Sequence, residues 1–255
     1  MNRSIASAVR RLTDAVEELG ALLVLGARCT VAPMRRGFEW RESLRQAYRF
    51  GVGSIGVLGT TAALVGGIMV IQAGIYVRRF GVQELVGWFA GYGVLRDVGP
   101  LVAGLVFSGR VGSRNAAEIA SMATREQLEG LRSIGVDRIS AVVAPRSLAM
   151  VGSLLALYAI GSAISILAAA GCAQVLLGID SAQFSRSLLA RTDVADIASG
   201  LLKSLVFAQA VAVVSCRSGL SATGGAVAVG DAAKRSVVRA AMWIVVLDLA
   251  VSRVL

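Results

Sequence analysis

The sequence predicts an all-α integral membrane protein with about five transmembrane helices, and three observations carry this prediction. Hydrophobic residues make up 56% of the 255 positions, above the roughly 45–50% of soluble domains. Phe50 to Val77 and Ser147 to Ile179 contain no charge for 28 and 33 positions, and each stretch exceeds the roughly 20 residues that cross a bilayer core. The mean hydropathy of +0.71 agrees with them.

Residues 1–34 are predicted to form an amphipathic helix in the membrane interface, or a shallow re-entrant elbow. Ile5 and Val9 begin an apolar stripe at helical spacing, whereas Arg10 and Asp14 occupy the remaining face. Because these charges precede any long apolar run, we do not expect a cleavable signal peptide here.

Apolar stretches predict five spans along the rest of the chain. They cover residues 53–76, 84–109, 144–170, 194–216 and 237–255. Residues 171–195 are expected to form a loop, and the glycine-rich connector 219–230 a tight turn before the last span. Asp248 interrupts the apolar character of that last span.

The second span is broken, and it carries charge at membrane depth. Ionisable side chains in hydrocarbon cost roughly 2.5 kcal/mol or more each, so they persist mostly where they face a bundle interior or a water-filled path. Arg96 and Asp97 point about 100° apart on a helix, so each needs its own partner. Gly99-Pro100 then frees backbone groups in mid-membrane. A transport route is the leading hypothesis, and a static kink is the alternative.

Residues 113–134 are predicted to form an amphipathic cytoplasmic helix. Ile119 and Met122 begin a partial apolar stripe, and the other face is charged. Arg125 and Glu129 have the spacing of an i,i+4 ion pair.

The distribution of basic residues predicts the topology. Nine Lys and Arg precede the first span, six lie between 110 and 146, and four between 217 and 239, whereas the opposite loops hold four. The positive-inside rule therefore places the N-terminus in the cytoplasm and the C-terminus on the other side. The net charge of +10 fits this rule better than nucleic-acid binding, because the arginines lie between apolar spans without interleaved aromatic residues.

Four polar residues from three spans form the candidate site. They are Gln72, Arg96, Asp97 and Lys203. In a compact bundle they could line one polar-edged cavity, and two cations beside apolar walls suit an anionic amphiphile such as a phospholipid. Two alternatives stay open: the charges form buried ion pairs that lock the bundle, or Lys203 snorkels to the membrane surface.

No catalytic or metal site is predicted. The chain has no histidine, and Cys29, Cys172 and Cys216 lack CxxC spacing. No Ser/His/Asp set or Walker A motif is found, and no GK[ST] follows the glycines of 219–230. Any energy source must therefore come from a partner.

Several short motifs follow one another along the chain. They are Leu95-Arg96-Asp97-Val98-Gly99-Pro100-Leu101, Ser108-Gly109-Arg110-Val111-Gly112-Ser113, Ala117-Glu118-Ile119, Thr124-Arg125-Glu126-Gln127-Leu128-Glu129-Gly130-Leu131, Ala144-Pro145-Arg146 and Lys203-Ser204. In this order they resemble the MlaE/YrbE family of ABC transporter permeases, and the resemblance covers about residues 36–255.

The resemblance implies a single permease domain over residues 1–255 in a bacterial inner membrane, with a periplasmic C-terminus. It implies a homodimer that binds cytoplasmic ATPase subunits and a periplasmic MCE-domain protein, and that moves phospholipid or related lipids between the inner and outer membranes. Bound ATP-Mg is expected in the partner ATPase, and no cofactor is expected in this chain.

The resemblance also implies residue roles. Helix 113–134 would be the coupling helix that fits a groove of the ATPase, and the lipid-cavity positions match Gln72, Arg96, Asp97 and Lys203. The coupling residues would be Glu118, Arg125, Glu126, Glu129 and Arg132. The chain departs from the family pattern at three positions. Glu129 stands where the family commonly has Asp, Gly130 where it has Ala, and Asp97 where it usually has Glu. Gly130 softens the helix by up to about 1 kcal/mol relative to Ala.

Two other classes of function stay open. A secondary transporter or channel would use Arg96, Asp97 and Lys203 as an ion relay without ATP, and inverted repeats, of which we find no convincing sign, would support it. A membrane anchor would only scaffold a periplasmic lipid-binding protein, and lipid traffic would then survive Arg96→Ala and Lys203→Ala.

Overall fold

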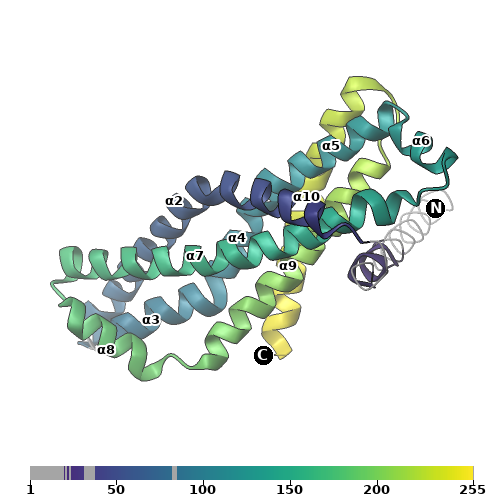
Figure 1. Cartoon of the computed structure of the whole chain (residues 1–255). Helices are drawn as coiled ribbons and strands as arrows, with labels where there is room; N and C mark the ends of the chain where they lie inside the picture. The colour runs from purple at the N-terminus through teal and green to yellow at the C-terminus, as the bar shows by residue number, and fades with distance from the viewer. Residues whose placement is uncertain (1–19, 21, 23, 32–37, 82–84, 255) are drawn as a thin grey trace, which may run out of the picture.

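The computed structural model of the chain describes residues 20, 22, 24–31, 38–81 and 85–254. Every element within these residues is a helix, which confirms the all-α prediction (Figure 1). Residues 24–31 are helical, but most of the interfacial helix predicted for residues 1–34 lies outside the described residues.

The described elements are helices of 5 to 41 residues, which follow one another directly or through short connections. The α-helices are α2 (Trp40–Phe80), α3 (Val86–Tyr92), α4 (Val98–Phe107), α5 (Ser113–Thr124), α6 (Gln127–Ser133), α7 (Ala144–Leu177), α8 (Ser181–Arg191), α9 (Val194–Leu220) and α10 (Gly225–Val254). Three π-helical segments, η3 (Gly93–Asp97), η4 (Ser108–Gly112) and η5 (Ile139–Val143), continue into the α-helices that follow them.

The helices form an elongated bundle (Figure 1). Helices α2 and α7 run side by side along it, α5 and α6 lie at one end, and α8 lies at the other. The core joins five helices through fully buried apolar side chains. Its largest members include Phe50, Phe107, Leu154, Phe207 and Ile244.

Four helical stretches are long and apolar enough to cross a membrane: Trp40–Tyr76, Val86–Thr124, Ile139–Leu177 and Val194–Leu220. They cover the first four predicted spans, apart from residues 84 and 85 of the second. Helix α10 covers the fifth as far as residue 254, and its 30 residues reach about 45 Å at 1.5 Å per residue. Charges along α10, among them Lys234 and Asp248, make it less apolar than the other four. The prediction of about five membrane helices is therefore confirmed in approximate number.

Several predicted boundaries were wrong. Helix α2 begins at Trp40 instead of residue 53, so part of the basic segment before the first span continues into it as one helix. The loop predicted for 171–195 contains the end of α7 and the whole of α8, whose Phe184 is buried. Helix α10 begins at Gly225, so the connector shortens to a turn in which Gly224 has a φ of 95°.

The break in the second span is the π-helical turn η3. It lies one turn before Gly99-Pro100, where the sequence predicted the break. In η3 the Val98 N–H bonds to the carbonyl of Gly93, five residues back. In that register the donor to the Leu95 carbonyl would be residue 100, which is proline and has no N–H. The hydroxyl of Tyr158 on α7 donates to this carbonyl instead. Protein groups therefore satisfy the backbone that Pro100 frees.

Glycine permits the close packing around this turn. A Cβ on Gly99 would lie 1.8 Å from the Val94 carbonyl oxygen, and a Cβ on Gly200 of α9 would lie 2.0 Å from the Leu95 carbonyl oxygen. Both positions need a residue without a side chain. Helix α9 therefore rests directly on the backbone of η3.

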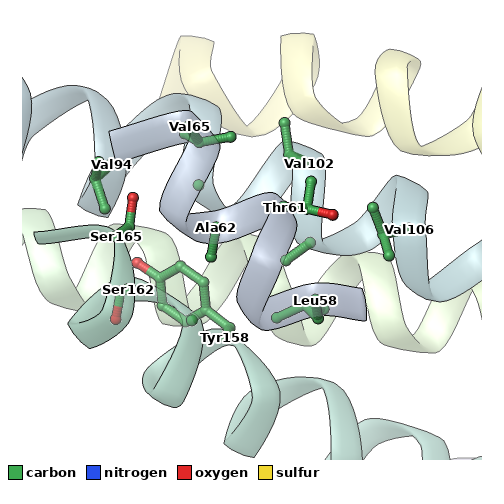
Figure 2. Close-up of a pocket in the computed structure, with 13 residues that line it drawn as sticks. Leu58, Thr61, Ala62, Val65, Val94, Val102, Val106, Tyr158, Ser162 and Ser165 are labelled. Carbon is green, nitrogen blue, oxygen red and sulfur yellow. The ribbon is translucent and has the colours of Figure 1, made fainter. Parts of the chain in front are cut away.

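A narrow crevice lies between α2, α4 and α7. Figure 2 shows it lined by Leu58, Ala62 and Val65 of α2, by Val102 and Val106 of α4, and by Tyr158, Ser162 and Ser165 of α7. It encloses only about 20 Å³, which is room for one water. A lipid chain does not fit between these helices.

Candidate functional site

Lys203 is buried in the bundle between two carboxylates. Its Nζ donates a hydrogen bond to Asp97 Oδ1 at 2.9 Å and forms an ion pair with Asp248 Oδ1 at 3.0 Å. The Lys203 side chain is 1% exposed, which excludes the interpretation that it snorkels to the surface. Because isolated buried charges are very costly, the two carboxylates are what keep this ammonium inside.

The two carboxylates differ in their exposure. The side chain of Asp97 is 59% exposed, whereas that of Asp248 is 22% exposed. Asp248 comes from α10 and Asp97 from the end of η3, so Lys203 of α9 joins three separate segments. Asp97 is the open side of the cluster, where a ligand or a second chain can reach it.

Arg96 has a different partner from its neighbour. Its Nη1 donates to Asp196 Oδ1 at 3.0 Å, and its guanidinium lies 5.4 Å from the ring centre of Tyr92. The other carboxylate oxygen of Asp196, Oδ2, accepts from the backbone N–H of Asp193, the N-cap of α9. Asp196 therefore caps α9 and holds Arg96 with the same carboxylate.

The expectation that Arg96 and Asp97 need separate partners is confirmed. The interpretation of buried ion pairs that lock the bundle describes Lys203 well. Among the described residues Gln72 forms no hydrogen bond or ion pair, and it is exposed on α2. The structure therefore joins Asp97 and Lys203 directly, places Arg96 beside them in sequence with another partner, and leaves Gln72 apart.

Sequence reasoning missed the roles of Asp196 and Asp248. The predicted site has two cations, Arg96 and Lys203, but one carboxylate, Asp97. This imbalance within the membrane indicates that further acidic residues lie nearby. Asp248 was visible as a charge inside the last span, and Asp193 and Asp196 have the spacing of a capping box before an apolar run.

A larger apolar hollow than the crevice lies elsewhere. A groove of about 600 Å³ lies between the helix of residues 24–31, α7, α9 and α10. Leu148, Val206, Trp243 and Leu247 are among its lining residues, and Gln209 is one of its few polar ones. None of the four predicted site residues lines it.

The predicted coupling helix 113–134 is two helices. Helix α5 ends at Thr124, and Glu126 takes a left-handed backbone with a φ of 59° before α6 begins. The i,i+4 pair predicted for Arg125 and Glu129 required one continuous helix and was wrong; Glu129 lies 3.7 Å from Arg138 instead.

The five predicted coupling residues fall into two groups. Arg125, Glu126, Glu129 and Arg132 are exposed at the end of the bundle. Glu118 lies on α5 and contacts arginines of three helices. The exposed group alone forms an accessible charged surface.

Membrane-length helices with paired charges inside and a charged helical projection at one end are the architecture of a multi-pass membrane protein. The family model described as Permease MlaE matches residues 43–254. The chain belongs to this family, which confirms the resemblance seen in its motifs. As a permease component of an ABC transporter it is not itself an enzyme, because the ATPase is a separate subunit.

Curated relatives agree with the family. A probable ABC transporter permease protein of Rickettsia typhi is 29% identical over 83% of this chain and 82% of its own length. One from Synechocystis is 31% identical, over 78% and 75%. The chloroplastic protein TRIGALACTOSYLDIACYLGLYCEROL 1 of Arabidopsis thaliana is 30% identical over 90% of this chain and 65% of that protein.

Proposed function

We propose that this permease moves phospholipid or a related lipid between the inner and outer membranes of a bacterium, as a homodimer with a cytoplasmic ATPase and a periplasmic MCE-domain protein. The observation that carries the proposal is the charged cluster of Asp97, Lys203 and Asp248 inside apolar helices, which is most exposed at Asp97. The name of the Arabidopsis relative, which refers to a galactolipid, supports a lipid as substrate.

The charges suit the headgroup of a lipid. The exposed Asp97 carboxylate can accept hydrogen bonds from ammonium or hydroxyl groups, and Arg96, whose side chain is 27% exposed, can donate to a phosphate. Leu202 and Leu249, the sequence neighbours of Lys203 and Asp248, are exposed, and such apolar side chains suit acyl chains. A second copy of the chain facing this surface would close the cavity that one chain leaves open.

The proposed mechanism is alternating access driven by the partner. With the N-terminus in the cytoplasm, α5 and α6 lie on the ATPase side and α8 on the periplasmic side. ATP-driven closure of the ATPases would push on α6, and the helices would squeeze the lipid out of the cavity. Gln72 is proposed to line the same cavity from α2.

The test is affinity purification of the tagged protein from its native host in mild detergent, followed by native mass spectrometry. An ATPase and a phospholipid in a complex with two permease copies support the proposal. A lone permease in several detergents, with neither partner nor lipid, overturns it. A complex with a periplasmic protein but no ATPase favours the membrane anchor.

A second candidate is ion-coupled transport without ATP. A lysine between two aspartates is an arrangement that a proton relay can use. Liposomes that contain the purified permease and a trapped pH dye distinguish the two functions. Proton flux that needs no ATP and is lost in Lys203→Met favours the relay, and absence of flux with active lipid transfer rejects it.

A further inference from the structure

Glu118 is the centre of a charge cluster that joins three helices. Its Oε1 lies 3.2 Å from Arg49 Nη2 of α2 and 3.1 Å from Arg114 Nε of α5, and its Oε2 lies 3.0 Å from Arg146 Nη1 of α7. Three arginines thus share one carboxylate, and without it they would repel one another.

Asn115, one turn earlier on α5, extends the cluster to a fourth helix. Its Oδ1 accepts from Arg146 Nη1 at 3.3 Å, and its Nδ2 donates to Ser215 Oγ of α9 at 2.8 Å. Asn115 is fully buried, so these hydrogen bonds are costly to break. Polar contacts therefore tie α5 to α2, α7 and α9.

Helix α5 is also continuous with the remaining membrane-length stretch, Val86–Thr124. Ile119, one turn after Asn115, is fully buried in a core cluster with Cys216 of α9. Contacts from α5 thus reach the other three membrane-length stretches, and α5 is itself part of the fourth. Helix α6 is held much less tightly, since Leu128 is the residue that it buries.

We propose that Glu118 is a positioning residue that transmits movement from the exposed helix α6 to the membrane helices, and that it does not itself dock the ATPase. Both of its oxygens are occupied by arginines of the same chain, and its side chain is only 25% exposed. This inference rests on the proposed function, since it needs an ATPase that moves α6.

The test uses Glu118→Gln in the complex purified from the native host. Three quantities are measured: the amount of bound ATPase, the rate of ATP hydrolysis, and the ATP-dependent transfer of a fluorescent phosphatidylglycerol between vesicles. We expect binding and hydrolysis to persist and lipid transfer to fall about tenfold, within the range of typical coupling between sites. Glu42→Gln is the matched control, because within the described residues the Glu42 carboxylate pairs with Arg45 and Gln46 of its own helix.

A second variant removes one of the excess cations. In Glu118→Gln with Arg146→Gln the repulsion among the arginines is reduced, and lipid transfer should recover in part. Ser215→Ala removes the hydrogen bond from Asn115 to Ser215 without changing any charge, while the bond from Asn115 to Cys216 Sγ of α9 remains. This weaker tie between α5 and α9 should lower transfer while hydrolysis persists. If the Glu118→Gln protein does not accumulate in the cell, the Ser215→Ala variant still tests the inference.

Two results overturn the inference. Loss of bound ATPase in Glu118→Gln, equal to that in Glu129→Gln, would make Glu118 a docking residue. Unchanged lipid transfer in both Glu118→Gln and Ser215→Ala would show that the cluster transmits nothing. A wild-type complex that holds no ATPase or transfers no lipid instead overturns the proposed function, and the inference with it.

Discussion

Arg96 and Asp196, 100 residues apart in the sequence, are joined by an ion pair of 3.0 Å between Nη1 and Oδ1. The pair ties the π-helical turn of the second span to the first turn of α9. Because Asp196 also caps α9, one carboxylate fixes both the start of that helix and the place of Arg96.

We predict that Asp196→Ala destabilises the protein by about 3 kcal/mol, because it removes a cap and the partner of a partly buried cation. Thermal unfolding of the purified protein in detergent measures this. Asp193→Ala is the control: it removes only the cap and should cost about 1 kcal/mol. Equal losses in the two variants would mean that the ion pair adds nothing.

Lys203→Met should destabilise the protein by about 3 kcal/mol, since it leaves Asp248 partly buried without a counterion. Adding Asp248→Asn should restore most of that loss, because the remaining carboxylate of Asp97 is largely exposed. A double-mutant cycle from unfolding in denaturant checks this. Additive losses would contradict the pairing.

Tyr158→Phe should cost about 1–2 kcal/mol, because the Leu95 carbonyl loses the donor that Pro100 cannot supply. Tyr76→Phe, on an exposed part of α2, is the control and should be neutral. In a Pro100→Ala background residue 100 regains an N–H, and the effect of Tyr158→Phe should shrink. The melting temperatures of the four variants test this.

Gly200→Ala should lower stability by about 2 kcal/mol or more, because the new methyl group would overlap the Leu95 carbonyl and the Tyr158 hydroxyl. Gly171→Ala in α7 adds the same group where nothing lies within 4 Å, and the higher helix propensity of alanine should leave it neutral or stabilising. Thermal unfolding compares them. A neutral Gly200→Ala would contradict the close contact of α9 with η3.

Glu126→Lys combined with Glu129→Lys should reduce the co-purified ATPase by roughly tenfold or more, because reversing charge on a docking surface places like charges opposite one another. Quantitative mass spectrometry of the purified complex measures this. Glu42→Lys, a reversal elsewhere on the chain, should retain the ATPase. Unchanged binding in the double variant would place the docking surface away from α6.

Local patterns predicted the helices better than their ends. The start of α9 at residue 194 was predicted correctly because Asp193 stands directly before an apolar run. Helix α8 was missed because it buries only Phe184 and has no long apolar face. The turn at Glu126 gave no signal, since neither glycine nor asparagine, the usual residues of left-handed backbone, marks it.

The sequence indicated which charged residues need partners, but not which residues those partners are. Arg96, Asp97 and Lys203 lie within apolar spans, and charges at that depth require partners. Which partners they have depends on how α9 and α10 pack on η3, and this is a property of tertiary contacts between distant segments. Glu118 likewise resembled a surface residue in the helical pattern, because its arginine partners Arg49 and Arg146 lie far away in the sequence.

The length of α2 fixes how deep the protein sits in its membrane. Its 41 residues extend for about 60 Å, roughly twice the thickness of the hydrocarbon layer. A helix of this length does not fit within the hydrocarbon layer at an ordinary tilt, so one of its ends must extend into the headgroup region and beyond it. The exposed Arg41 and Arg45 lie at the first turns of α2, and with the proposed cytoplasmic N-terminus each cation would gain about 1 kcal/mol from anionic lipids. Helix α2 thus sets the depth in the bilayer at which the buried charges lie.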